Sequence, residues 1–268
     1  MGILAQRMKE LRLEKKMKQA EVARAIGLST TAYCNYEYGS RDPQTATLVA
    51  LAQFYHVSTD YLLGVNEPMP EERTRIILAS NSPRRRELLG QMGITEFKVS
   101  APNVDESVEE GLSPVQIVEE LSLRKARAAK KAGPRDIVIA ADTVVALDGA
   151  VLGKPRDQED AFAMLSALSG REHHVYTGVT VLQGERSVTE HEETAVVFRA
   201  LEPDEIRGYI ATGEPMDKAG AYGIQGLGAL LVSGIRGDYC NVVGLPMFRL
   251  GRILGRFGVN LLLNKEQL

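Results

Sequence analysis

The sequence predicts an α/β domain preceded by a small all-α domain. In residues 1–68, apolar residues recur at the three- and four-residue spacing of short helices. In residues 75–268, short apolar runs typical of strands alternate with helical patterns, which is the arrangement of α/β domains. Residues 69–74 place a proline beside acidic residues, so we expect a linker there.

Composition and charge limit the classes of protein that the chain can belong to. The chain has 268 residues, 44% of them hydrophobic and 25% charged, which is ordinary for a globular protein of two domains. A net charge of −3 argues against binding nucleic acid or membrane by bulk electrostatics. Cys34 and Cys240 are far apart and form no metal-binding pattern. With no visible signal peptide and no long apolar run, we expect a cytoplasmic protein that does not contact the membrane.

Five short helices are expected in the first domain. Gly27 should end the second, because glycine tolerates the left-handed conformation found after helices. Ser29 and Ser58 should cap the third and fifth, since a serine hydroxyl accepts an unpaired backbone N–H. The expected helices cover residues 4–11, 19–26, 30–37, 47–55 and 59–63. A tight turn between the second and third is typical of a helix-turn-helix.

Three motifs in this domain resemble the phage-repressor-like DNA-binding family of lambda repressor and Cro. They are Gln19-Ala20-Glu21-x-Ala23, Gly27-Leu28-Ser29 and Tyr36-Glu37-x-Gly39-x-Arg41-x-Pro43. The resemblance implies that the third helix enters the major groove of duplex DNA. The side chains that would face the DNA are Gln19, Thr30, Thr31 and Asn35. The domain's net charge is only about +1, so the alternative is a helical domain used for protein contacts or dimerisation.

An anion site is predicted where the second domain begins. A short apolar strand from Ile76 stops at a polar turn, and Ser82 and Pro83 suit the cap and first position of a helix. Free backbone N–H groups at this helix start, followed by the arginines of residues 84–86, suit a multiply charged anion such as phosphate. The alternative is a capped surface helix with a solvated basic turn.

The remaining elements of this domain alternate along the chain. Asp148-Gly149 is a strong hairpin signal, and Ser113-Pro114 should open a helix. The glycines of residues 217–228 allow backbone N–H groups to approach a ligand, although a tight loop between strands is the alternative. Strands are expected at 97–100, 136–142, 144–147, 151–155, 175–177, 179–183 and 194–198, and helices at 113–131, 157–168, after Pro203 and after Pro246.

Asp142 is the candidate with catalytic chemistry. It is expected to end an apolar strand, where open α/β sheets place their ligand sites. A carboxylate there can hold a metal, orient water or act as a base, whereas the alternative is a hydrogen-bonded structural aspartate. Candidate cations lie in short polar breaks beside apolar elements, and together they favour cleavage of a phosphate ester or anhydride. These cations are Arg84, Arg85, Lys125 and Lys154.

A series of motifs over residues 76–250 resembles the Maf family, nucleoside triphosphate pyrophosphatases also named for septum-formation inhibition. The motifs are Ala79-Ser80-x-Ser82-Pro83-Arg84-Arg85-x-Glu87-Leu88-Leu89, Asp105-Glu106, Lys125-Ala126, Ala141-Asp142-Thr143, Gly153-Lys154-Pro155, Leu168-Ser169-Gly170, Asp217-Lys218-Ala219-Gly220-x-Tyr222-x-Ile224-Gln225-Gly226 and Asn241-x-x-Gly244-Leu245-Pro246. The resemblance implies a Maf/ITPase-like α/β domain with a mixed sheet, two lobes with a cleft between them, and often a homodimer. The added helical domain departs from the family's usual form.

The resemblance also implies hydrolysis of a nucleoside triphosphate to the monophosphate and pyrophosphate with a divalent metal, Mg²⁺ or Mn²⁺. Asp142 would be the general base that activates water, and Glu106 a metal ligand. The residues that would hold the phosphates are Ser82, Arg85, Lys125 and Lys154.

Within that family, subgroups differ at the positions occupied here by Arg84, Thr143 and Gln225, and this set resembles the dTTP/UTP subgroup. A pyrimidine with two carbonyls and one ring N–H offers a mixed edge. Gln225 can donate and accept at once, whereas Arg84 can only donate. We therefore expect dTTP and UTP, or close 5-substituted uridine relatives, to be hydrolysed ahead of ATP, GTP and CTP.

Two other classes of protein stay open from the sequence. One is a DNA-binding transcriptional regulator whose catalytic fold only senses nucleotide. The presence of Asp142 and both lysines argues against it, because a sensor has no need of them. The other is an interaction protein that arrests cell division, with catalysis secondary.

Overall fold

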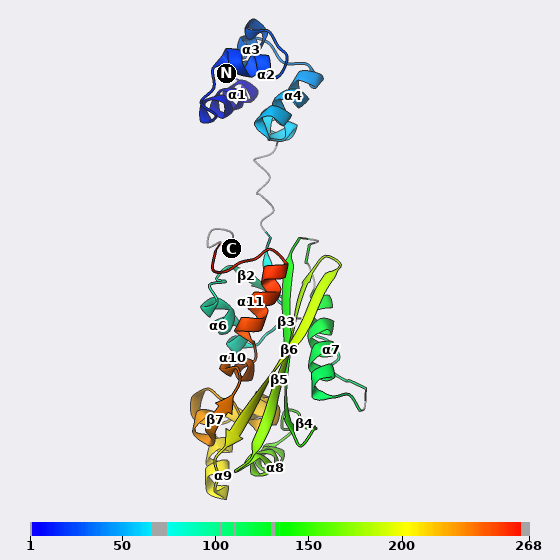
Figure 1. Ribbon diagram of the computed structural model, residues 1–268, viewed down its shortest axis with the longest axis vertical. Helices are drawn as coiled ribbons and strands as arrows, with labels where there is room; N and C mark the ends of the chain where they lie inside the picture. The colour runs from blue at the N-terminus through cyan, green and yellow to red at the C-terminus, as the bar shows by residue number, and fades with distance from the viewer. Residues whose placement is uncertain are drawn as a thin grey trace. The chain divides into compact units, whose positions relative to one another are not determined.

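The computed structural model describes residues 2–65, 74–101, 103–109, 111–129, 132–133 and 135–263. The chain forms two compact units, Met1–Arg73 and Thr74–Leu268, each with its own hydrophobic core (Figure 1). Of the expected linker, residues 69–74, only Thr74 lies within the described residues. No helix in the described parts of the chain combines the length and apolar character needed to cross a membrane.

The amino-terminal unit contains five helices around one core, as predicted. They are α1 (Ile3–Glu14), α2 (Gln19–Ala25), α3 (Thr30–Glu37), α4 (Thr45–Tyr55) and α5 (Thr59–Leu63). Tyr33, Leu51 and Leu62 are fully buried at its centre. Each helix is short, so its stability comes from burying this shared apolar side.

The predicted caps of this unit are confirmed. The Ser29 hydroxyl accepts the backbone N–H of Ala32, and the Ser58 hydroxyl accepts that of Tyr61. Gly27 follows α2 with a φ of 74°, in the left-handed region that glycine adopts without strain. The turn between α2 and α3 is therefore fixed by local sequence.

The second unit is built on a mixed seven-stranded sheet, which confirms the predicted α/β fold. Its strands are β1 (Ile76–Leu78), β2 (Phe97–Val99), β3 (Ile137–Leu147), β4 (Ala150–Leu152), β5 (Glu172–Gln183), β6 (Arg186–Phe198) and β7 (Val232–Arg236). The strand order is β2-β1-β3-β5-β6-β7, with β4 paired to β3. β1 is parallel to β2 and β3, and the other pairs are antiparallel.

Three strand predictions are wrong in length. The expected strands 175–177 and 179–183 are one continuous strand, β5, and the expected strand 194–198 begins much earlier, at Arg186. Polar residues interrupt the apolar pattern of both strands, but the β5–β6 pairing continues past them. The expected hairpin is confirmed, because Asp148 and Gly149 both have positive φ, 51° and 81°, as its turn requires.

Helices cover both faces of the sheet (Figure 1). α7 (Pro114–Arg127) lies on one face, where it contacts β3 and β5. It ends before the expected 131; residues 130 and 131 lie outside the described residues. The opposite face carries α6 (Pro83–Gln91), α8 (Gln158–Leu168), α9 (Pro203–Ala211), α10 (Tyr239–Val243), α11 (Met247–Arg256) and the 3-10 helices Glu214–Asp217, Ala219–Ala221 and Gly226–Leu231.

The opposite face holds two hydrophobic clusters. One packs α6 and α11 against the sheet, and the other packs α8 and α9 against it. Along β3, Ala141 belongs to the first cluster and Val145 to the second. Thr143, which faces the same side, therefore lies between the two clusters.

α7 approaches the sheet closely because β5 has a glycine beneath it. A Cβ atom on Gly178 would lie 2.2 Å from the backbone oxygen of Val118 in α7. Gly178 is the partner of Asp142 in the β3–β5 pairing. The closest approach of helix and sheet is thus beside the predicted catalytic residue.

Candidate active site

The candidate site lies at an interruption in the pairing of one edge of β3. β1 pairs with Ile137–Ile139 and β4 pairs with Val145–Leu147 on that edge. No described strand pairs there with residues 140–144, and Asp142 is at the centre of this interval. The expectation that Asp142 ends its strand is wrong, because β5 pairs with β3 on both sides of it. The strand that ends here is β1, so the site still lies at the carboxyl end of a parallel strand.

Asp142 and Thr143 bring both faces of the sheet into the site. Adjacent residues of a strand point to opposite faces. Asp142 faces α7 and contacts Lys125, whereas Thr143 faces α6 and contacts Arg85.

Lys125 joins the two acidic residues of the predicted site. Its Nζ donates to Asp142 Oδ1 at 2.5 Å and forms an ion pair with Glu106 Oε1 at 2.7 Å. The Lys125 and Asp142 side chains are only 13% and 12% exposed, so each charge needs the other as a partner. The hydrogen bond from Lys125 lowers the pKa of Glu106 and outweighs the effect of burial; the charges of Lys154 and Arg85 lower it further. Three of the predicted cations, Lys125, Lys154 and Arg85, thus act on Glu106.

Arg85 is held rigidly at the start of α6. Its guanidinium donates to the Gly244 backbone oxygen at 2.8 Å, to Ser80 Oγ at 3.2 Å and to Thr143 Oγ1 at 3.1 Å. Burial lowers the pKa of Arg85, and the negative charge of Asp142 opposes that shift. An arginine fixed in this way keeps a constant direction toward an incoming phosphate.

Three residues that support the site were not predicted as site residues. Ser80 accepts from Arg85, and the Thr143 and Thr177 hydroxyls form a hydrogen bond of 2.9 Å. Thr177 in turn donates to the Asn241 backbone oxygen at 2.9 Å. Ser80 and Asn241 belong to motifs noted in the sequence. No sequence motif indicates Thr177, because only the β3–β5 register brings it to Thr143.

Ser82 and Lys154 are placed less directly. Ser82 stands at the start of α6, but its hydroxyl makes no capping hydrogen bond, so that expectation is wrong. Its backbone N–H donates instead to Ser80 Oγ at 3.2 Å, which bends the chain before the helix. Lys154 is exposed just after β4 and reaches the site through its charge acting on Glu106.

Arg84 contacts the glycine-rich segment that carries Gln225. Arg84 Nη1 lies 3.8 Å from Oδ2 of Asp217, which opens the glycine-rich segment. Gln225 precedes the 3-10 helix Gly226–Leu231 of that segment, and no described residue forms a recorded hydrogen bond with its side-chain amide. The structure therefore links Arg84 to the segment that carries Gln225, without direct contact between the two.

The backbone around Glu106 is held by one arginine of α7. Arg124 Nη1 donates to the backbone oxygens of Asp105 at 2.5 Å and Ser107 at 2.8 Å. Asp105 Oδ1 also accepts the Ser107 N–H at 2.9 Å, which closes a local turn. Glu106 therefore lies between two residues, Asp105 and Ser107, whose backbone is held by hydrogen bonds.

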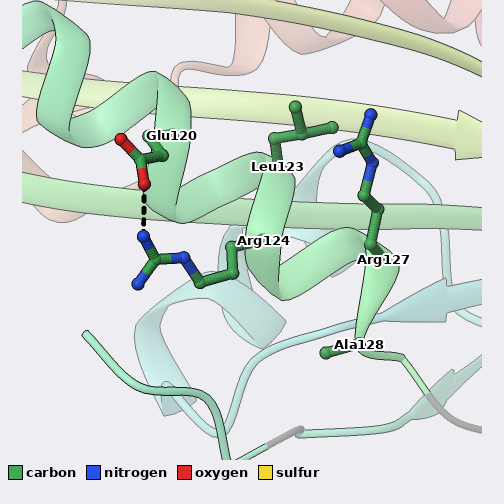
Figure 2. A pocket seen from close by; sticks show the side chains of 5 residues that line it. All are labelled: Glu120, Leu123, Arg124, Arg127 and Ala128. Carbon is green, nitrogen blue, oxygen red and sulfur yellow. Dashed lines mark hydrogen bonds and ion pairs between the residues drawn. The ribbon is translucent and has the colours of Figure 1, made fainter. Parts of the chain in front are cut away.

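A surface hollow of about 430 Å³ lies along α7, but it is not the candidate site. Figure 2 shows its lining, in which Glu120 and Arg124 form an ion pair. Its lining residues are Glu120, Leu123, Arg124, Arg127 and Ala128. None of them is a predicted site residue.

The donor set at Lys125 fits the predicted divalent metal. Within the described residues, no three His, Cys, Asp or Glu side chains are grouped to hold a metal. Mg²⁺ in nucleotide enzymes is commonly bound by one or two carboxylates together with substrate phosphates. Glu106 and Asp142, which meet at a single ammonium group, provide two such carboxylates.

The predicted DNA-contact residues differ in their availability. Thr30 and Thr31 are exposed at the start of α3, and Asn35 is half-buried one turn further on. Gln19 is engaged within the unit, because its amide nitrogen donates to Glu37 Oε1 at 3.0 Å. Thr30 and Thr31 are thus the freest of the four.

The second unit is an α/β domain in which a buried carboxylate, fixed cations and a helix start lie together, a combination that suits a multiply charged anion. The chain belongs to the Maf-like protein family, whose family model matches residues 75–257. A second family model, described as helix-turn-helix, matches residues 8–62.

Similar proteins cover most of the second unit. The dTTP/UTP pyrophosphatase of Symbiobacterium thermophilum is 54% identical over 184 residues, which are 69% of this chain and 94% of that protein. The dTTP/UTP pyrophosphatase of Moorella thermoacetica is 54% identical over 190 residues, 70% of this chain and 97% of that protein. A crystal structure of the P22 c2 repressor protein in complex with synthetic operator 9T matches 25% of this chain and 100% of that chain, with 27% identity and a TM-score of 0.24.

Proposed function

We propose that this chain is a nucleoside triphosphate pyrophosphatase that hydrolyses dTTP and UTP to the monophosphate and pyrophosphate. The observation that carries the proposal is the group formed by Asp142, Lys125 and Glu106 beside the fixed Arg85. It lies in a domain that is 54% identical to proteins named dTTP/UTP pyrophosphatase.

Asp142 acts as the general base. Its Oδ1 accepts from Lys125, and no described residue is recorded as donating to its Oδ2, so that oxygen is available to a water. The water attacks the α-phosphorus and gives its proton to Asp142. The bond from phosphorus to the bridging oxygen breaks, and pyrophosphate leaves with the electron pair.

The cations of the site bind the triphosphate and stabilise its transition state. Arg85 and Lys125 are held in place before substrate arrives, so little reorganisation is needed as charge develops. Lys154 and the start of α6 at Ser82 contribute from the edges. A bound Mg²⁺ or Mn²⁺, held by Glu106, would neutralise further phosphate charge.

Arg84, Thr143 and Gln225 select the nucleobase of the substrate. The Thr143 hydroxyl is shared between Arg85 and Thr177, so it contributes to selection of the nucleobase chiefly by holding Arg85 in place. The unengaged amide of Gln225 can donate and accept at the mixed edge of uracil or thymine. Cytosine reverses one of those hydrogen bonds and leaves a polar group unpaired, so CTP is a poorer substrate.

Pyrophosphate release from dTTP, UTP, CTP, ATP and GTP, each with Mg²⁺ and with Mn²⁺, tests the proposal. We expect kcat/KM to be highest for dTTP and UTP with either metal. A purine triphosphate ranked first would contradict the base preference, and no turnover of any nucleotide would contradict the activity and favour the nucleotide-sensing regulator. We also propose that the protein acts in the cytoplasm, where its substrates are, and that it forms a homodimer, which light scattering tests.

A second function, binding of duplex DNA, is favoured by the exposed Thr30 and Thr31 at the start of α3 in the helix-turn-helix. Because the unit is nearly neutral, we propose weak binding that is strengthened by dimerisation. Fluorescence anisotropy of the whole chain with labelled duplex should show affinity falling as salt rises, since phosphate contacts release counterions. No salt-dependent binding at high protein concentration would favour a role in protein contacts.

A further inference from the structure

One carboxylate holds both ends of residues 223–228, the second half of the glycine-rich segment. Glu214 Oε1 accepts the Gly228 N–H at 3.1 Å, and its Oε2 accepts the Leu227 N–H at 3.2 Å. The Tyr209 hydroxyl donates to Glu214 Oε1 at 2.9 Å and accepts the Gly223 N–H at 3.2 Å. Glu214 thus reaches Leu227 and Gly228 directly and Gly223 through Tyr209.

These hydrogen bonds bracket Gln225. Gly223 lies two residues before Gln225 and Leu227 two residues after it. The Gln225 amide has no recorded hydrogen-bond partner among the described residues, so the backbone determines where its side chain starts. That backbone is extended, with φ −91° and ψ 164°, immediately before the 3-10 helix.

The segment is packed tightly around the same carboxylate. A Cβ atom on Gly226 would lie 3.0 Å from Glu214 Oε2, and one on Gly228 would lie 2.0 Å from the Gly223 backbone oxygen. Burial raises the pKa of Tyr209, so its hydroxyl stays protonated and continues to donate to Glu214. The path of residues 223–228 therefore depends on Glu214 being present as a two-oxygen acceptor.

We propose that Glu214 is a positioning residue for base selection, because it fixes the backbone from which Gln225 reaches the pyrimidine. The inference rests on the proposed function. Glu214 itself does not touch the base. An amide on a fixed backbone cannot rearrange its donor and acceptor to suit cytosine, whereas an amide on a loosened backbone can do so.

The test compares kcat/KM for UTP and CTP in the wild type, Glu214→Gln, Tyr209→Phe and Gln225→Ala. Glu214→Gln keeps the shape but turns an N–H group toward a backbone N–H, so the UTP/CTP ratio should fall about tenfold, the effect of one lost hydrogen bond to a charged group. Tyr209→Phe removes only the hydroxyl that links Glu214 to Gly223, so it should lower the UTP/CTP ratio less. In the Gln225→Ala background, Glu214→Gln should lower the ratio no further, since both act through one contact.

Glu193→Gln is the matched control. Glu193 also accepts a tyrosine hydroxyl, that of Tyr176 at 3.0 Å, but it lies on β6, outside the glycine-rich segment, so its variant should keep the wild-type ratio. The ratio does not depend on how much protein is active, so partial unfolding cannot imitate the effect. An unchanged ratio in Glu214→Gln and Tyr209→Phe, with UTP still preferred by the wild type, would overturn the role of Glu214 alone. A wild type that prefers a purine would overturn the proposed base preference as well.

Discussion

At the scale of single residues, Lys125 decides how the acidic groups of the site behave. It contacts both Asp142 and Glu106, so a buried carboxylate and a mostly exposed one share one positive charge. When substrate phosphates arrive, they compete for the same ammonium group. The proposed base and the proposed metal ligand are therefore linked through one ammonium group, which substrate phosphates can draw away from both.

Asp142→Asn should nearly abolish hydrolysis while the protein stays folded. Loss of a general base typically lowers the rate by about 10²–10⁴-fold. The rate of pyrophosphate release at saturating UTP measures this loss. Asp148→Asn, in the exposed turn after the same strand, is the control and should keep normal activity because asparagine tolerates that positive φ. Turnover of Asp142→Asn within a few-fold of wild type would remove Asp142 from the mechanism.

The Arg12–Glu37 pair should make the amino-terminal unit sensitive to acid. Burial alone would raise the pKa of Glu37, which is 1% exposed, but hydrogen bonds from Arg12, Gln19 and Tyr33 lower this pKa below the ordinary glutamate value of 4.5. A carboxylate with a lowered pKa in the folded state stabilises that state above its unfolded pKa. This stability is lost as the pH falls through the folded value.

Glu37→Gln should remove that pH dependence and destabilise the unit by about 3 kcal/mol, because Arg12 is left buried without its charge partner. Hydrogen exchange of backbone amides in residues 2–65, measured in the whole chain at pH 7 and below pH 4, distinguishes the loss of stability from the loss of its pH dependence. Equal protection of wild type and variant at pH 7 would contradict the predicted loss of stability.

At the scale of elements, α7 connects the site to the fold. Its closeness to β5 depends on Gly178, and two of its side chains serve the site differently: Lys125 contacts the carboxylates, whereas Arg124 holds the backbone on both sides of Glu106. A small displacement of this helix would therefore move the cation and the second carboxylate together.

Arg124→Met should raise the Mg²⁺ concentration needed for half-maximal activity by about tenfold or more, as is usual when a partner of a metal ligand is lost. The rate at saturating Mg²⁺ should change less, since Asp142 and Lys125 remain. Arg127→Met is the control: it lies on the same helix and is exposed, with no recorded contact to the described residues. Equal Mg²⁺ dependence in the two variants would show that Arg124 does not position Glu106.

Gly178→Ala should destabilise the second unit by about 3 kcal/mol, because the added methyl collides with the backbone of α7 and the helix must shift. Activity should fall as well, because the shifted helix moves Lys125 away from Asp142. Gly208→Ala, in the interior of α9 with open space around it, should instead stabilise by about 0.5 kcal/mol. Urea unfolding gives both values. Similar behaviour of the two variants would contradict the close approach of α7.

Local rules explain which elements could be predicted from sequence. The Ser29 cap and the Asp148-Gly149 hairpin depend on a few neighbouring residues, and both are confirmed. The position of Asp142 within its strand could not be predicted, because it depends on where β1 and β4 stop pairing with β3. The same is true of Thr177, whose contact with Thr143 arises only from strand register.

At the scale of the whole molecule, the chain combines two units with separate cores. The residues proposed for nucleotide chemistry all belong to the unit that starts at Thr74. The exposed threonines proposed for DNA belong to the other unit. Each function should therefore be testable without the other.

A chain shortened to residues 74–268 should keep kcat/KM for UTP within about twofold of the whole chain, because a unit with its own core can fold alone. Circular dichroism confirms that the shortened chain is folded before activity is compared. Loss of activity in a folded shortened chain would show that the amino-terminal unit contributes to catalysis.

The interruption in pairing beside Asp142 also bears on self-association. An unpaired strand edge is a template on which another chain can add a strand, which leads to aggregation. Here the unpaired interval, residues 140–144, is about 17 Å long at ~3.3 Å per residue and is closed by β1 at one end and β4 at the other. A strand from another molecule would have to displace β1 or β4 to pair there, whereas a nucleotide is short enough to enter. The same two short strands that leave the edge of β3 unpaired beside Asp142 thus protect the sheet from joining its neighbours.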